Sequence, residues 1–81
     1  MNAKAELLSL VDEFLSGEDQ SISLINSIEG VLVENFPESR AFEELAEPLS
    51  FFRPGCGPPY CDVQGMREAL QGASDSLNYL E

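Results

Sequence analysis

The fold of this chain is indicated most clearly by the segment KAELLSLVDEFLSG at residues 4–17. Its apolar side chains recur at three- and four-residue steps, which places them on one face of an α-helix. They are Leu7, Leu8, Val11, Phe14 and Leu15. Gly17 stands where a C-terminal cap belongs, because glycine adopts the left-handed cap conformation without steric cost. The segment therefore predicts an amphipathic helix over residues 4–16.

A similar apolar spacing predicts a second helix over residues 20–36. Its core stripe consists of Ile22, Ile25, Ile28, Leu32 and Phe36, widened by Leu24 and Val31. Either Asp19 or Ser21 can cap its start. Gly30 weakens the helix by about 1 kcal/mol relative to alanine, and indicates a close helix contact or a bend.

Pro37 separates the second helix from a third, because proline disfavours helical geometry at the residue before it. Proline also fits the first turn of a helix, so we expect the third helix to span residues 38–53 with Asn35 as a cap. Its core stripe consists of Ala41, Phe42, Leu45, Leu49 and Phe52. Pro48 removes a backbone hydrogen bond inside this span, which predicts a kink or a restart there.

The segment from Arg53 to Cys61 cannot be helical, since three prolines and two glycines fall within nine residues. Asp62 then caps a last helix over residues 63–80. Its apolar face consists of Met66, Ala69, Leu70, Ala73, Leu77 and Leu80. These four helices with short connections predict an all-α fold, a small antiparallel four-helix bundle. A chain of 81 residues fits one domain, here residues 1–81.

The composition is strongly acidic, with 15 Asp and Glu against 4 Lys and Arg, no His, and a net charge of -11. Phosphate binding needs a basic surface, so direct nucleic-acid binding is excluded. Lack of histidine removes the commonest general base and metal ligand, so we expect no enzyme and no cofactor. Between Ala5 and Ser39 eight carboxylates occur without one basic residue. Solubility alone can account for acidity, but soluble surfaces usually mix both signs, which favours a basic partner.

No segment of the sequence indicates export or a membrane. The longest purely apolar run is Val31–Val33, against the roughly 20 residues that a spanning helix needs. The N-terminal residues do not form a signal-peptide pattern. With two cysteines and no secretion signal, we expect a cytoplasmic protein with reduced thiols.

The two cysteines, Cys56 and Cys61, lie in the glycine- and proline-rich loop. Zinc needs four ligands, and even with the adjacent Asp62 no histidine completes a site, so we expect no metal. The spacing is also not the Cys-x-x-Cys redox motif. A disulfide under oxidising conditions and two free thiols remain as alternatives, of which the cytosol favours the thiols.

A candidate binding surface lies on the third helix, where carboxylates occupy the side opposite the apolar stripe. Paired carboxylates can catalyse glycoside hydrolysis, but a tight bundle of this length has little room for a cleft. Binding is therefore the expected role. Phe51, Phe52 and Tyr60 frame one end, and we expect core packing for them, with Tyr60 the one most exposed. The predicted partner-binding residues are Glu38, Glu43, Glu44, Glu47, Tyr60 and Asp62.

Two segments carry a resemblance to a known family. LLSLVDEFLSGE at residues 7–18, followed by a second helix and an acidic third, and QGMREALQ at residues 64–71 resemble the small bacterial immunity proteins of the colicin D immunity type. The loop that begins at Arg53 is not part of that pattern. The resemblance implies a helical bundle whose acidic face covers the basic active site of a tRNA-cleaving nuclease toxin and mimics the phosphates of its substrate.

The sequence thus leads to one main functional hypothesis and two alternatives. The main hypothesis is an acidic, immunity-type inhibitor that binds and blocks a basic nuclease toxin. The alternatives are a phage-type inhibitor of nucleic-acid-binding defence machinery and a non-catalytic adaptor domain. The sequence does not fix the oligomeric state, although an exposed apolar bundle face would favour a dimer.

Overall fold

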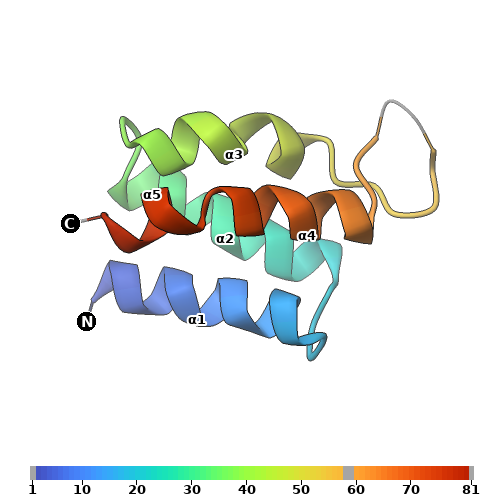
Figure 1. Ribbon diagram of the computed structural model, residues 1–81, viewed down its shortest axis with the longest axis horizontal. Helices are drawn as coiled ribbons and strands as arrows, with labels where there is room; N and C mark the ends of the chain where they lie inside the picture. Colours follow the sequence, from blue (N-terminus) through green and yellow to red (C-terminus); the bar gives the residue numbers. More distant parts are fainter. Residues whose placement is uncertain (1, 58–59, 81) are drawn as a thin grey trace.

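The computed structural model describes residues 2–57 and 60–80. Within these ranges the chain forms five helices and no β-strand (Figure 1). The helices are α1 (Ala3–Ser16), α2 (Ile22–Asn35), α3 (Arg40–Ser50), α4 (Val63–Gly72) and α5 (Ser74–Asn78). The all-α class is therefore confirmed. None of the helices in the described ranges combines the length and the apolar character that crossing a membrane requires.

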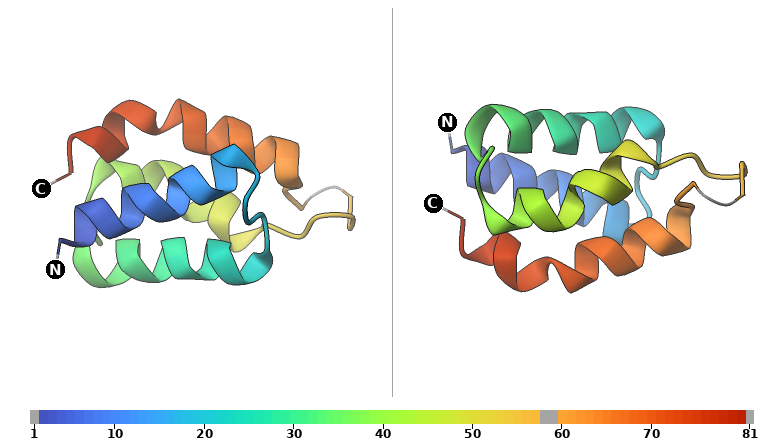
Figure 2. Two further views of the ribbon diagram at one scale, coloured as in Figure 1. Left: turned by 90° about the horizontal axis from the view of Figure 1, so that it is seen from below. Right: turned by 90° about the horizontal axis from the view of Figure 1, so that it is seen from above.

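The helices surround a single shared core. α1 packs on α2 and α4, and α3 also packs on α2 and α4, while α5 continues from α4 and contacts α3. The two ends of the chain lie at one end of the molecule, and the loop between α3 and α4 projects from the other end (Figures 1 and 2). That loop is therefore the part of the described chain that extends furthest from the helices.

The core is entirely apolar, and no polar or charged side chain of the described residues is buried. Most positions of the predicted stripes are buried, from Leu7 in α1 to Leu77 in α5. The prediction that Ile22 belongs to the core stripe is wrong. Ile22 is the first residue of α2 and its side chain is exposed, whereas Leu24 is buried in the core. Every charge of the described chain must consequently be accommodated at the surface.

The junction of α1 and α2 follows the predicted capping residues. Gly17 adopts a left-handed conformation with φ of 87° and donates its N–H to the Phe14 carbonyl. Of the two candidate caps for α2, Ser21 is the one used, because its Oγ accepts from the Leu24 amide at 3.1 Å. Asp19 instead accepts from Ser21, and hydrogen bonds from the Ser21 hydroxyl and amide lower the pKa of Asp19.

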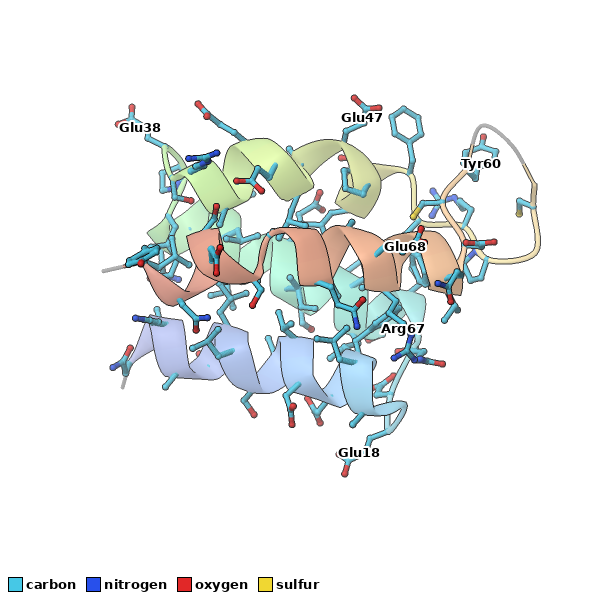
Figure 3. All side chains as sticks on the ribbon, in the orientation of Figure 1. Glu18, Glu38, Glu47, Tyr60, Arg67 and Glu68 are labelled. Carbon is cyan, nitrogen blue, oxygen red and sulfur yellow. The ribbon has the colours of Figure 1, made fainter. Side chains whose placement is uncertain are left out.

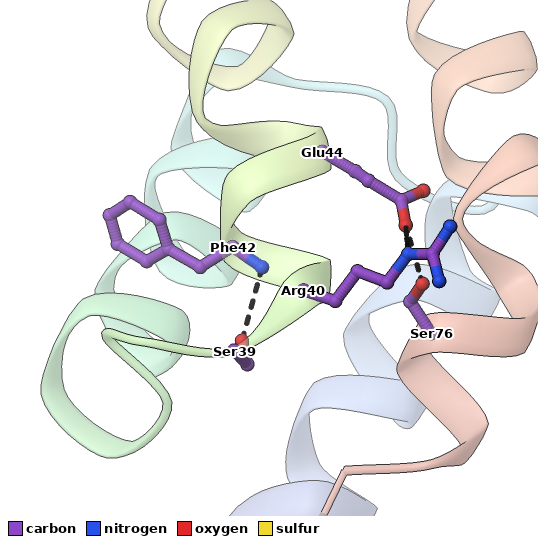
Figure 4. Close-up of polar contacts among 5 residues, drawn as sticks. All are labelled: Ser39, Arg40, Phe42, Glu44 and Ser76. Atoms are coloured by element: carbon purple, nitrogen blue, oxygen red, sulfur yellow. Dashed lines mark hydrogen bonds and ion pairs between the residues drawn. The ribbon is translucent and has the colours of Figure 1, made fainter.

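The start of α3 differs from the prediction. The helix does not begin at residue 38 with Asn35 as its cap; Ser39 is the cap, and its Oγ accepts from the Phe42 amide at 3.1 Å (Figure 4). Pro37 accordingly lies in the turn between the helices and not in the first turn of α3. A serine hydroxyl three residues before Phe42 satisfies a free N-terminal amide, which Asn35 is too far along the chain to reach.

Prolines and glycines also change the other predicted boundaries. Pro48 lies within α3, and the helix continues through it to Ser50, short of the predicted end at residue 53. The last predicted helix is divided at Ala73, directly after Gly72, whose low helix propensity favours a break. Gly30 marks no close contact, because a side chain there would meet nothing within 4 Å.

Two basic side chains join helices by donating hydrogen bonds to backbone carbonyl groups. The Lys4 Nζ donates to the Asn78 carbonyl at 2.6 Å, and the Arg67 Nη1 donates to the Leu15 carbonyl at 2.9 Å. Both carbonyls belong to the last turn of a helix, where cations are favoured by free acceptors and by the helix dipole. These contacts join α1 to α5 and α4, and they use two cations without neutralising a carboxylate.

The core face of α3 can be tested with Leu45→Ala. The Leu45 side chain is 0% exposed, so truncation should lower the free energy of unfolding by about 2 to 5 kcal/mol. Val33→Ala is the control, because Val33 is 48% exposed and its truncation should stay within about 0.5 kcal/mol. Urea unfolding followed by circular dichroism measures both, and equal midpoints for Leu45→Ala and the parent would contradict this core.

Candidate functional site

The outward face of α3 carries the exposed carboxylates Glu43 and Glu47. They face solvent because Leu45 and Leu49 of the same helix are buried on its opposite side. Glu43 lies in the first turn, where the helix dipole favours a negative charge. The one ion pair formed by the described residues joins Arg40 to Glu44. Glu43 and Glu47 therefore present charges that no cation of the described chain neutralises.

Glu44 has a different environment from its neighbours. Its Oε1 accepts from the Arg40 Nε at 3.0 Å and from the Ser76 Oγ at 2.6 Å (Figure 4). The second contact joins α3 to α5. Glu44 is thus turned toward α5 and partly neutralised, which separates it from the outward pair.

The other predicted residues lie at both ends of α3. Glu38 precedes one end of the helix, whereas Glu47 points outward near the other end, on the side of the molecule where Tyr60 lies (Figure 3). Asp62 is the N-cap of α4, as predicted, and its Oδ1 accepts from the Gly65 amide at 2.7 Å. Of the six predicted residues, the structure thus places Glu47 and Tyr60 toward the same end and Glu38 toward the opposite one.

The loop that carries Tyr60 is held at its base by backbone hydrogen bonds. The Arg53 amide donates to the Cys61 carbonyl at 2.9 Å, and the Cys61 amide donates to the Phe51 carbonyl at 2.7 Å. Within the loop Gly55 and Gly57 adopt positive φ of 86° and 73°, a conformation that favours glycine. Pro58 and Pro59, which belong to the loop predicted from the sequence, lie outside the described residues.

The three aromatic residues at this end do not share one role. Phe52 is 1% exposed and meets Phe14 edge to face at a ring distance of 5.8 Å. Phe51 and Tyr60 are 44% and 45% exposed, with ring centroids 6.4 Å apart. The expectation that Phe51 packs in the core is therefore wrong. The helical steps Leu45, Leu49 and Phe52 could have shown this, since Phe51 falls outside that spacing.

One further carboxylate reaches this surface from α2. The Glu29 Oε2 lies 3.4 Å from the Ser50 Oγ, at the C-terminal end of α3. Helical periodicity predicts that Glu29 lies on α2. It does not predict the contact with Ser50, which joins residues 21 positions apart in the chain. We call Glu29, Glu43, Glu47, Phe51 and Tyr60 together the α3 surface.

Both cysteines of the loop are free thiols. Cys56 is exposed, whereas Cys61 is half-buried. Burial, and to a smaller extent the negative charge of Asp62, raises the pKa of the Cys61 thiol. Within residues 2–57 and 60–80, no three cysteine or carboxylate side chains gather closely enough to hold a metal ion.

An open hollow of about 750 Å³ lies between α5 and the start of α3. Its walls include Arg40, Glu44, Asp75 and the exposed Tyr79. Its acidic and basic groups are those of the Arg40–Glu44 pair together with Asp75.

Comparisons of the chain with protein-family models, with curated proteins and with solved structures found no match in any of the three. The function must consequently be inferred from the geometry and charge of the described residues.

The environments of the two thiols predict different rates of alkylation by iodoacetamide. Cys56 should react several-fold faster than Cys61 at neutral pH, because the raised pKa of Cys61 reduces its thiolate fraction and its side chain is half-buried. Asp62→Asn should quicken the reaction of Cys61 by removing the adjacent charge, while asparagine still caps α4. Mass spectrometry over time measures both rates, and equal rates at the two sites would contradict this assignment.

Proposed function

We propose that this protein is an acidic, immunity-type inhibitor that binds and blocks a basic nuclease toxin by presenting carboxylates in place of substrate phosphates. The proposal is supported above all by the outward carboxylates of α3, which no cation of the described chain neutralises. It is also in keeping with the resemblance to immunity proteins of the colicin D type. In this proposal the protein has no catalytic role and works in the cytoplasm.

The distribution of the basic residues supports a long-range electrostatic role. Lys4 and Arg67 donate to helix carbonyls, and Arg40 forms the one ion pair of the described residues. Most of the 15 carboxylates therefore contribute to an unneutralised negative field. Such a field accelerates association with a positively charged cleft and disfavours acidic partners.

The exposed aromatic residues supply apolar contact area, which charged side chains alone do not. Tight protein complexes usually depend on a few buried aromatic or apolar anchors surrounded by polar contacts. Phe51 and Tyr60 lie at the end of the α3 surface to which Glu47 belongs. A partner that covers them would bury apolar area and meet the carboxylates in the same contact.

We also propose the finer topology on which this surface depends, an antiparallel four-helix bundle in a single domain. In this description α4 and α5 together form the fourth helix. The short connections from α1 to α2 and from α2 to α3, and the packing of each helix on two neighbours, support it. The arrangement leaves the outer side of α3 free along its length.

Charge reversal on α3 tests the inhibitor proposal once a partner has been copurified from the native host. Glu43→Lys combined with Glu47→Lys should slow association and weaken binding by roughly 10-fold at low ionic strength, and less at high salt. Folding should persist, since exposed charges contribute little to stability. Surface plasmon resonance at several salt concentrations measures these rates.

Asp12→Lys combined with Glu18→Lys is the matched control, because it makes the same change in charge away from α3. Asp12 is an exposed residue of α1, and Glu18 follows that helix on the side of the molecule opposite Glu47 (Figure 3). The control should weaken binding much less than the α3 variant. An affinity indifferent both to salt and to the α3 substitutions would reject phosphate mimicry and favour the adaptor role.

A further inference from the structure

The Phe51 and Tyr60 rings form an exposed pair on a fixed backbone. The Phe51 carbonyl accepts from the Cys61 amide at 2.7 Å, and the Tyr60 amide donates to the Gly57 carbonyl at 2.9 Å. The ring planes are inclined by 48°, so the rings do not stack face to face. Each ring therefore keeps surface available to a ligand, and little conformational entropy is lost when the pair is covered.

The electrostatic environment of the pair is negative. Glu47 lies one helical turn before Phe51, whose amide donates to the Glu47 carbonyl at 3.1 Å. Glu29 approaches the same end of α3 through Ser50. The last turn of α3 contains no basic residue, so the negative end of its helix dipole is also uncompensated.

Arg53 is the basic residue next to this pair in the sequence. Within the described residues its guanidinium forms no ion pair and no hydrogen bond; only its backbone is engaged, with its amide donating to Cys61 and its carbonyl accepting from Cys56. The carboxylates of this end therefore form no ion pair with Arg53, although Arg53 follows Phe51 by only two residues.

Aromatic faces beside carboxylates suit one side chain in particular. A guanidinium is planar and weakly hydrated, stacks on aromatic rings, and can donate two hydrogen bonds to one carboxylate. An ammonium is compact and strongly hydrated, so it gains less from such a site. We propose that Phe51, Tyr60 and Glu47 together receive an arginine side chain of the basic protein partner. This assignment rests on the function proposed above and specifies how its contact is anchored.

Charge also distinguishes this occupant from a second copy of the chain. Self-association through the pair would bring together two chains that each carry a net charge of -11. It would also oppose the Glu47 side chains around the contact. Repulsion of this kind disfavours wrong partners, whereas a basic surface is attracted.

The assignment can be tested with hexa-arginine and hexa-lysine peptides, which carry equal charge. Hexa-arginine should bind the parent protein about 2- to 5-fold more tightly at low ionic strength, as expected for an exposed cation–π contact. Isothermal titration calorimetry gives the affinities. Chemical-shift changes in NMR spectra should be largest at Glu47, Phe51 and Tyr60.

Phe51→Leu and Tyr60→Leu should each reduce the arginine preference toward 1, because leucine keeps the apolar surface and removes the aromatic face. Tyr79→Leu is the matched control: Tyr79 is 84% exposed and lies with α5 at the end away from the loop (Figure 1). It should retain the preference. Thermal melts confirm folding, and Tyr60→Leu alone decides the outcome if Phe51→Leu does not fold.

Equal binding of the two peptides by the parent overturns the assignment, and so does a preference that survives both leucine substitutions. Either result leaves the inhibitor proposal standing, because that proposal depends on the carboxylates. Glu43→Lys with Glu47→Lys should weaken both peptides by reducing the general acidic field, and should weaken hexa-arginine more, because Glu47 belongs to the assigned site. The ratio of the two affinities is therefore the measurement specific to the aromatic site.

Discussion

The contact between Phe52 and Phe14 determines the arrangement of the whole loop end. It fixes Phe52, two residues after the end of α3, against Phe14 of α1 at a ring distance of 5.8 Å. Because Phe52 points inward, the preceding Phe51 must point outward. An isolated β-bridge pairs Phe52 with Cys61, just before the start of α4. This pairing places Tyr60 beside Phe51. One buried ring thus gives rise to an exposed pair.

A second constraint is electrostatic. A small domain gains limited stability from its core, and this one must also hold a net charge of -11. This charge does not disturb the core, because no polar or charged side chain of the described residues is buried. The repulsion between carboxylates therefore acts at the surface, where water screens it. Two of the four cations are committed to joining helices through carbonyls. The molecule therefore remains folded while its acidic surface stays exposed to solvent.

Local pattern was sufficient to predict what depends on neighbours along the chain. The apolar steps of α1, the cap at Gly17 and the cap at Asp62 were all readable in this way. The sequence was less reliable where several residues could cap one helix. Ser39 is the N-cap of α3, although Asn35 was expected there. Contacts between distant segments, such as Glu44 with Ser76 or Glu29 with Ser50, carry no periodicity. For that reason the division of the α3 carboxylates into an outward pair and an inward residue needed the structure.

The clamp at the base of the loop has an evolutionary consequence. Its two hydrogen bonds join backbone groups only, from Arg53 to Cys61 and from Cys61 to Phe51. The residues that the structure describes between these anchors, 54–57 and Tyr60, are all exposed, so apart from the glycines at positive φ they contribute no buried contact to the bundle. They are free to diverge without cost to the bundle. Under the function proposed above, a lineage that carries this scaffold could therefore exchange one partner for another by substitutions in the loop, while inheriting its fold and its acidic face unchanged.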